Sequence, residues 1–195
     1  MKKHTLIYII VIFIIAIAIS FTLTLGKNEI KDETKISQIV QDSNLEILLT
    51  LGNFERANYE ISKLLETSMK ISEKIGCMNE NVENGYIQYV NADELHEIIT
   101  QLTGIQMEAP IQIEDFYYVY DSENEYYYCV PIIISSYSID SINHIYENNG
   151  TFTIESSISK KQDGEIVDAK TVTTTLKYVE ENTYAKYQII SQKFN

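Results

Sequence analysis

Histidine and cysteine are scarce in this 195-residue chain, which holds three His and two Cys. His96-Glu97 begins a zinc-protease pattern, but Thr100 stands where a second histidine would have to share the metal with His96. Neither cysteine has metal-ligand spacing, and the seven glycines form no phosphate-binding loop. We therefore expect no metal site and no cofactor.

Positive charge is sparse as well. Beyond residue 26 the chain has 13 Lys and Arg against 28 Asp and Glu, and the whole chain carries a net charge of −13. Such a domain repels nucleic acid and anionic lipid headgroups, so DNA and RNA are excluded as partners. Tryptophan is absent and Arg56 is the single arginine, whereas tyrosine numbers 15. With abundant Ile and Asn, this composition is typical of a low-GC bacterium.

Charge is missing altogether from residues 6–25, where fourteen of twenty residues are Leu, Ile, Val or Phe. Twenty helical residues span about 30 Å, the thickness of the hydrocarbon core of a bilayer. Residues 1–26 are therefore predicted to be a signal-anchor transmembrane segment, with the lipid bilayer as partner of residues 6–25. The absence of a cysteine directly after the run excludes a bacterial lipid anchor.

The alternative for this run is a signal peptide cleaved near Ala18, because Ala16-Ile17-Ala18 has the small residues that a signal peptidase reads. Apolar residues continue past that point, which favours an uncleaved anchor. Basic residues flank the run on both sides, and the very short amino tail decides the orientation. We expect a single-pass protein of the cell membrane with its N-terminus cytoplasmic and its C-terminal domain extracellular.

Residues 27–35 are predicted to be a charged linker. Residues 36–76 are predicted to form two amphipathic helices joined at Gly52-Asn53, and Asn53 is expected to cap the second helix. The pair forms a helical hairpin or a stalk. Its apolar faces must be buried against each other, against the following domain or against another copy in a homo-oligomer.

Residues 86–195 are predicted to form an α+β extracytoplasmic domain. A strand over 86–90 precedes a short helix that begins at an Asn91 cap and stops at Gly104. Strands over 116–120 and 126–134 then flank a polar hairpin loop, and Pro131 indicates an edge or a bulge.

The last third of the chain reads as a three-strand antiparallel meander. Asn149-Gly150 and Asp163-Gly164 are turn signals, and residues 171–175 are β-branched throughout. Helices first and strands last indicate an α+β class, with a helix packed on a curved antiparallel sheet that ends in a C-terminal meander.

This order resembles the cone-shaped NTF2-like (cystatin-like) fold, whose chain also runs from helices into a curved antiparallel sheet. The residues that carry the resemblance are Thr173–Lys177 pairing with Lys186–Ser191, and it covers residues 86–195. The resemblance implies a small extracytoplasmic domain of a Gram-positive bacterium. Some domains of this kind serve as scaffold subunits of envelope assemblies. The resemblance assigns no catalytic residue.

Two pairs of residues are candidates for chemistry. Asp140 could orient His144 as a general base if the segment were helical; the alternative is an ordinary surface histidine. Cys77 and Cys129 could form a disulfide outside the cell, worth about 4 kcal/mol in the loop-entropy model, or remain two separate thiols.

Tyrosines gather on both sides of the predicted hairpin. Their alternate members would form a cross-strand aromatic ladder, each pair worth roughly 0.2 to 1 kcal/mol. The ladder either fills the core or exposes an aromatic face for a protein or glycan. The residues are Tyr117, Tyr118 and Tyr120 on one strand and Tyr126, Tyr127 and Tyr128 on the other.

The leading hypothesis is a membrane-anchored, noncatalytic binding or assembly module outside the cell. The alternatives are an enzyme that uses an NTF2-like pocket with Asp140 and His144, and a protein secreted after cleavage near Ala18.

Overall fold

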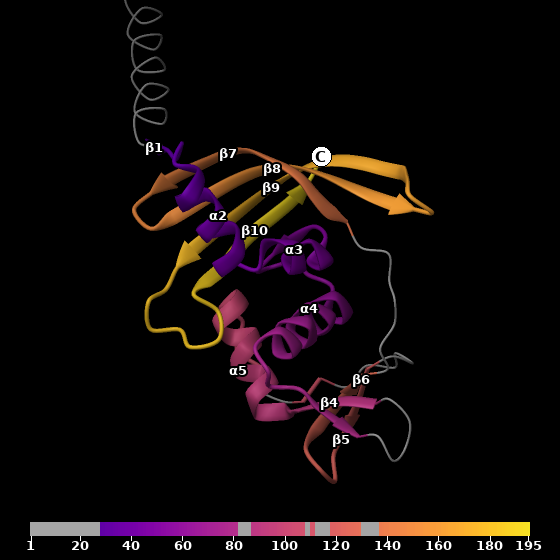
Figure 1. Cartoon of the computed structure of the whole chain (residues 1–195). Coiled ribbons are helices and arrows are strands. Elements are labelled where there is room, and N and C mark those ends of the chain that lie inside the picture. Colours follow the sequence, from indigo (N-terminus) through magenta and orange to yellow (C-terminus); the bar gives the residue numbers. More distant parts are fainter. Residues whose placement is uncertain (1–27, 82–86, 108–109, 112–117, 130–136) are drawn as a thin grey trace, which may run out of the picture.

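The computed structural model describes residues 28–81, 87–107, 110–111, 118–129 and 137–195. This part of the chain is α+β, with α-helices packed between two antiparallel sheets (Figure 1). The predicted transmembrane run, Tyr117 and Pro131 lie outside the described residues. Within them, no helix has both the length and the apolar character needed to cross a membrane.

The larger sheet has six strands in the order β1-β7-β8-β9-β10-β2, all antiparallel. Its edges are two-residue strands from distant parts of the chain, and its centre is a meander of long strands. The bounds are β1 Asn28–Glu29, β2 Phe54–Glu55, β7 Ser138–Asn148, β8 Thr151–Gln162, β9 Glu165–Tyr178 and β10 Tyr187–Phe194.

Both predicted turns are confirmed. Asn149 and Gly150 have φ of 49° and 74°, and Asp163 and Gly164 have 52° and 86°, which is the left-handed pair that a tight hairpin requires. The meander has four strands rather than three, because β7 also belongs to it. Two bulges in β7 break the alternation of polar and apolar residues that would have marked it as a strand.

The predicted linker is ordered. β1 pairs with β7, the Ile30 backbone N–H donates to the Ile145 carbonyl at 2.8 Å, and α2 (Glu33–Asp42) begins within the expected linker. Asp32 caps this helix by accepting from the backbone N–H groups of Thr34 and Lys35.

The two predicted long helices are shorter than expected. The first is broken at Ser43-Asn44, where Asn44 adopts φ of 56°, and it continues as α3 (Leu45–Leu48) and the 3₁₀ helix η1 (Leu49–Leu51). Asn53 does not cap the second helix: its side chain accepts from the Phe194 backbone N–H at 2.9 Å, and β2 follows. α4 therefore begins only at Ile61 and runs to Lys74. Pairing with β10 overrides the local helix signal.

The smaller sheet has the order β3-β4-β6-β5 and contains the predicted hairpin. Its strands are β3 Asn79–Asn81, β4 Ile87–Asn91, β5 Tyr118–Asp121 and β6 Tyr126–Cys129. α5 (Ala92–Thr103) follows β4 as predicted, with Asn91 accepting from two backbone N–H groups and Gly104 ending the helix at φ of 71°. α5 contacts β10 on one side and β4 and β6 on the other.

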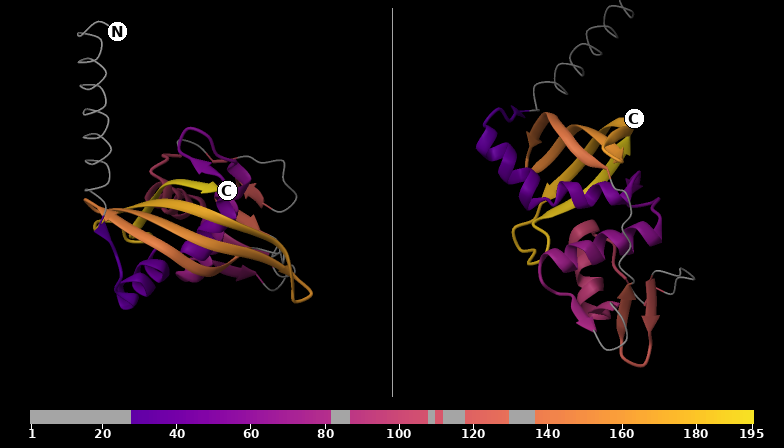
Figure 2. Two further views of the ribbon diagram at one scale, coloured as in Figure 1. Left: turned by 90° about the horizontal axis from the view of Figure 1, so that it is seen from above. Right: turned by 45° about the vertical axis from the view of Figure 1, so that its right-hand side comes forward.

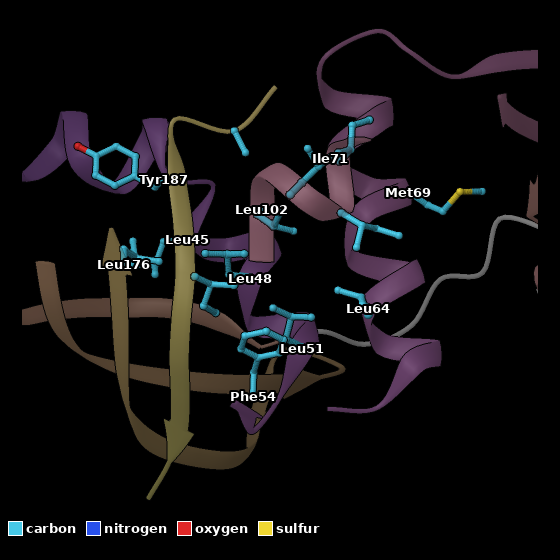
Figure 3. Close-up of a cluster of buried hydrophobic side chains, with 14 of the residues drawn as sticks. Leu45, Leu48, Leu51, Phe54, Leu64, Met69, Ile71, Leu102, Leu176 and Tyr187 are labelled. Carbon is cyan, nitrogen blue, oxygen red and sulfur yellow. The ribbon is translucent and has the colours of Figure 1, made fainter. Parts of the chain in front are cut away.

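The main hydrophobic core joins the helices to the larger sheet (Figure 3), and Leu49, Ile158 and Val172 form a second, smaller cluster. The helices of residues 36–76 therefore bury their apolar faces against the following domain, one of the three expected alternatives. Seen from above, the long strands of the larger sheet lie side by side (Figure 2, left). The face of this sheet that is turned away from the helices is polar, with a run of half-buried Thr side chains. Buried residues from both layers include Leu45, Leu48, Leu51, Leu64, Leu102, Ile154, Leu176, Tyr187 and Ile189.

Candidate functional site

The predicted tyrosine ladder divides between the two faces of the smaller sheet. Tyr120 lies opposite Tyr127, and their ring centroids are 5.1 Å apart, as the ladder requires. Tyr127 is 1% exposed, so this pair belongs to the interior. Tyr118 pairs with Cys129 in the backbone register, but its side chain lies outside the described part of the chain.

The opposite face of this sheet carries three tyrosines in mutual contact. The ring of Tyr89 lies 5.0 Å from that of Tyr126 and 5.8 Å from that of Tyr128, and the last two are 6.4 Å apart. Val119, opposite Tyr128 in the register, is 53% exposed beside them. We call Tyr89, Tyr126, Tyr128 and Val119 the tyrosine face. The sequence alone does not predict that Tyr89 lies beside the hairpin, because only the pairing of β4 with β6 brings it there.

An acidic loop borders the tyrosine face. Asp121 accepts from the backbone N–H groups of Glu123 and Asn124 and from the Asn124 side chain, so the loop is a hydrogen-bonded turn. These bonds hold the pKa of Asp121 below its usual value. Burial, and then the Asp121 carboxylate, raise the pKa of the Tyr128 phenol. Glu123 and Glu125 are exposed, so the rim of the face is negatively charged.

Tyr127 supports the tyrosine face from behind through its hydroxyl. The hydroxyl oxygen accepts from the Ile111 backbone N–H at 2.6 Å and lies 2.9 Å from Nε2 of His96. Burial lowers the pKa of His96 and favours its neutral form. His96 on α5 therefore packs against Tyr127 and is hydrogen-bonded to its hydroxyl.

Asp140 and His144 are not brought together as a catalytic pair. Both lie on β7, a strand, so the helical condition fails, and four residues of strand span about 13 Å. Asp140 accepts from the Ser159 hydroxyl at 2.8 Å, whereas His144 Nδ1 lies 2.8 Å from the Glu29 carboxylate. The His144 ring also stacks on Tyr146. Each side chain therefore contributes to sheet packing.

Cys77 is half-buried and forms no disulfide with any described side chain. Burial and a hydrogen bond with the Glu94 carboxylate raise its pKa to about 11, so it is a poor nucleophile near neutral pH. The side chain of Cys129 lies outside the described residues, and the disulfide with Cys77 stays a prediction. Among the described side chains, no group of three or more His, Cys, Asp or Glu could hold a metal ion.

No protein-family model matches the chain, and neither a curated protein nor a solved structure does. The resemblance to the NTF2-like fold therefore stays a prediction.

Proposed function

We propose that this protein is a noncatalytic binding or assembly module of the outer face of a bacterial cytoplasmic membrane. In this proposal residues 6–25 anchor it and the tyrosine face binds a protein partner. The single observation that carries the proposal is the contact cluster of the half-buried Tyr89, Tyr126 and Tyr128, which lies beside the exposed Val119 on the face of the smaller sheet opposite the buried Tyr127.

The position of the tyrosine face supports the proposal. β1 begins at Asn28, just after the apolar run, and it forms one edge of the larger sheet. The smaller sheet lies at the opposite end of the molecule, beyond the helices (Figure 1). A membrane that held residues 6–25 would therefore lie near the larger sheet, at the end of the molecule opposite the smaller sheet that carries the tyrosine face.

The chemistry of the tyrosine face favours a protein partner. Tyrosine gives a large and rigid contact area with a polar end, and it is enriched at protein interfaces. The buried Tyr127 and its bonds to His96 and Ile111 hold β6 in place, which lowers the entropy lost on binding. The acidic rim of Asp121, Glu123 and Glu125 favours a partner with basic residues at the periphery.

The experiment is cross-linking in intact cells that express the full chain. Tyr89→Ser and Tyr126→Ser should abolish a cross-linked species formed by the unaltered protein. Tyr178→Ser, on the larger sheet, changes a 43% exposed tyrosine in the same way and should leave that species intact. A species of twice the chain mass would identify the partner as a second copy. Cross-linking that is equal in all variants, or absent throughout, would contradict the proposal.

A further inference from the structure

A cavity of about 330 Å³ is lined by η1, helix α4 and strands β9 and β10, and it includes no residue of the tyrosine face. Three of the 15 basic residues of this acidic protein line it: Lys63, Lys70 and Lys170. Glu66 is the one carboxylate among its lining residues. The lining side chains therefore carry a net charge of +2 in a chain of net charge −13, and the adjacent carboxylates of Glu60 and Asp168 pair with Lys63 and Lys170.

The three ammonium groups are held in place, and each retains donors for a ligand. Lys170 donates to Asp168 and to the Tyr137 hydroxyl, both at 2.8 Å, and Lys70 donates to Glu66 at 2.7 Å and Thr50 at 3.3 Å. An ammonium has three N–H groups, so one remains on each lysine after its acceptors among the described residues are counted.

Lys63 is the least constrained of the three lysines. Its one acceptor among the described residues is Glu60, at 2.9 Å, which leaves two N–H groups. The side chains of all three lysines are 35% to 39% exposed, so a ligand from solvent can reach them.

Gly52 allows the Lys63 ammonium to lie close to the backbone at the cavity. A Cβ built on Gly52 would lie 3.3 Å from Lys63 Nζ, tighter than an ordinary contact. Gly52 also has φ of 64° and ψ of −140°, a conformation that only glycine adopts without strain. The turn after η1 thus both ends the helix and makes room for the charged group.

An aromatic pair forms the apolar wall of the cavity. The rings of Tyr137 and Phe194 meet edge to face with centroids 5.6 Å apart, and Lys170 Nζ lies 5.2 Å from the Tyr137 ring centre. Leu49 adds an aliphatic surface. A cavity lined by ammonium groups and by aromatic rings suits a ligand with a charged end and a flat apolar body.

We propose that this cavity binds a small organic anion. Its phosphate or carboxylate group bonds to the ammonium groups of Lys63, Lys70 and Lys170, and its apolar body packs on Tyr137 and Phe194. This site is separate from the tyrosine face and does not depend on the function proposed for that face.

The test is calorimetric titration of the full chain, in nanodiscs of phosphatidylcholine, with phenyl phosphate, with benzoate and with the neutral benzamide. Saturable binding of at least one anion, and weaker binding of benzamide, is expected. Phenyl phosphate and benzoate distinguish a phosphate from a carboxylate as the preferred head group. Absence of saturable binding for both anions would overturn the proposal.

Charge-neutral variants locate the binding. Lys63→Gln and Lys170→Gln should each lower the association constant of the preferred anion by about fivefold or more, because each removes a charge-assisted donor. Lys63→Gln is the safer variant for folding, since its partner Glu60 is 65% exposed. Lys177→Gln, at the other end of β9, makes the same charge change and should have no effect. An equal loss in all three variants, or no loss in any, would overturn the proposal.

Discussion

Gln192 and Thr174 lie opposite each other on β10 and β9, and their side chains are hydrogen-bonded at 3.1 Å in the interior. The Gln192 amide group donates its two hydrogens to the carbonyls of Leu48 and Gly52, each at 2.9 Å. Gln192 is 2% exposed and Thr174 is fully buried. One buried amide therefore joins the sheet to the end of η1, with its oxygen and both its hydrogens in bonds.

Gln192→Leu should lower the free energy of unfolding by about 2 to 4 kcal/mol, because it removes the interior hydrogen bonds to the Leu48 and Gly52 carbonyls and to the Thr174 hydroxyl. Urea unfolding followed by far-UV circular dichroism measures the change. Gln162→Leu, at the exposed end of β8, is the matched control and should lie within about 0.5 kcal/mol of the unaltered protein. Equal stability of the two variants would show that the Gln192 bonds contribute little.

Tyr127→Phe should lower the free energy of unfolding by about 1 to 2 kcal/mol, since the Ile111 N–H loses its acceptor. The same urea unfolding experiment, followed by far-UV circular dichroism, measures the change. Tyr178→Phe removes a hydroxyl from an exposed tyrosine and is the matched control, which should lie within about 0.5 kcal/mol of the unaltered protein. If Tyr127→Phe proved as stable as this control, the Tyr127 hydroxyl would contribute little.

Stability should fall as the pH drops below about 6.5, the ordinary pKa of histidine. The pKa of His96 is lowered in the folded state, so the unfolded chain binds this proton first and acid favours unfolding. The loss grows until the pH falls past the lowered pKa of the folded state. Unfolding curves at pH 7 and pH 5 test this, and His96→Gln should show a smaller difference between them. An identical pH dependence in that variant would assign the effect to other groups.

Cys77 should react slowly with iodoacetamide at pH 8, because a thiol with a pKa of about 11 is almost entirely protonated there. Glu94→Gln should speed the reaction a few-fold by removing the carboxylate, while the larger contribution of burial remains. Mass spectrometry of the unreduced protein measures the extent of Cys77 alkylation over time. A chain two mass units lighter than the sequence, with neither cysteine alkylated, would instead establish the Cys77–Cys129 disulfide.

Protease added to intact protoplasts should digest the part of the chain beyond residue 27 if it lies outside the cell. Sequencing the amino end of the mature protein distinguishes an uncleaved membrane anchor from a signal peptide that has been removed. A start at Met1 indicates the anchor, and a start just after Ala18 indicates secretion. Full protection from protease would contradict the proposed topology and the function that depends on it.

Local signals were sufficient for α5 and for the turns of the meander. Asn91 and Gly104 bound α5, and Asn149-Gly150 has few other conformations available. Each of these features depends on residues adjacent in sequence, so the pattern alone determines the structure.

Features that depend on distant partners could not be predicted from the sequence. Asn53 looks like a helix cap, but the Phe194 backbone N–H, 141 positions away, takes its side chain. The sequence of β7 has no regular alternation of polar and apolar residues, so only its pairing with β8 identifies it as a strand. Tyr89 lies in the tyrosine face only because β4 pairs with β6. The three lysines of the cavity come from α4 and β9 and have no common sequence motif.

β1 has a mechanical consequence. β1 pairs with β7, the Ile30 backbone N–H also donates to β7, the Glu29 carboxylate is hydrogen-bonded to His144, and Lys35 forms an ion pair with Glu147. If residues 6–25 anchor the protein as proposed, a force transmitted through the chain to Asn28 would act on all of these bonds together. The orientation of the larger sheet would then follow that of β1, and rotation of the domain about this point would be restricted.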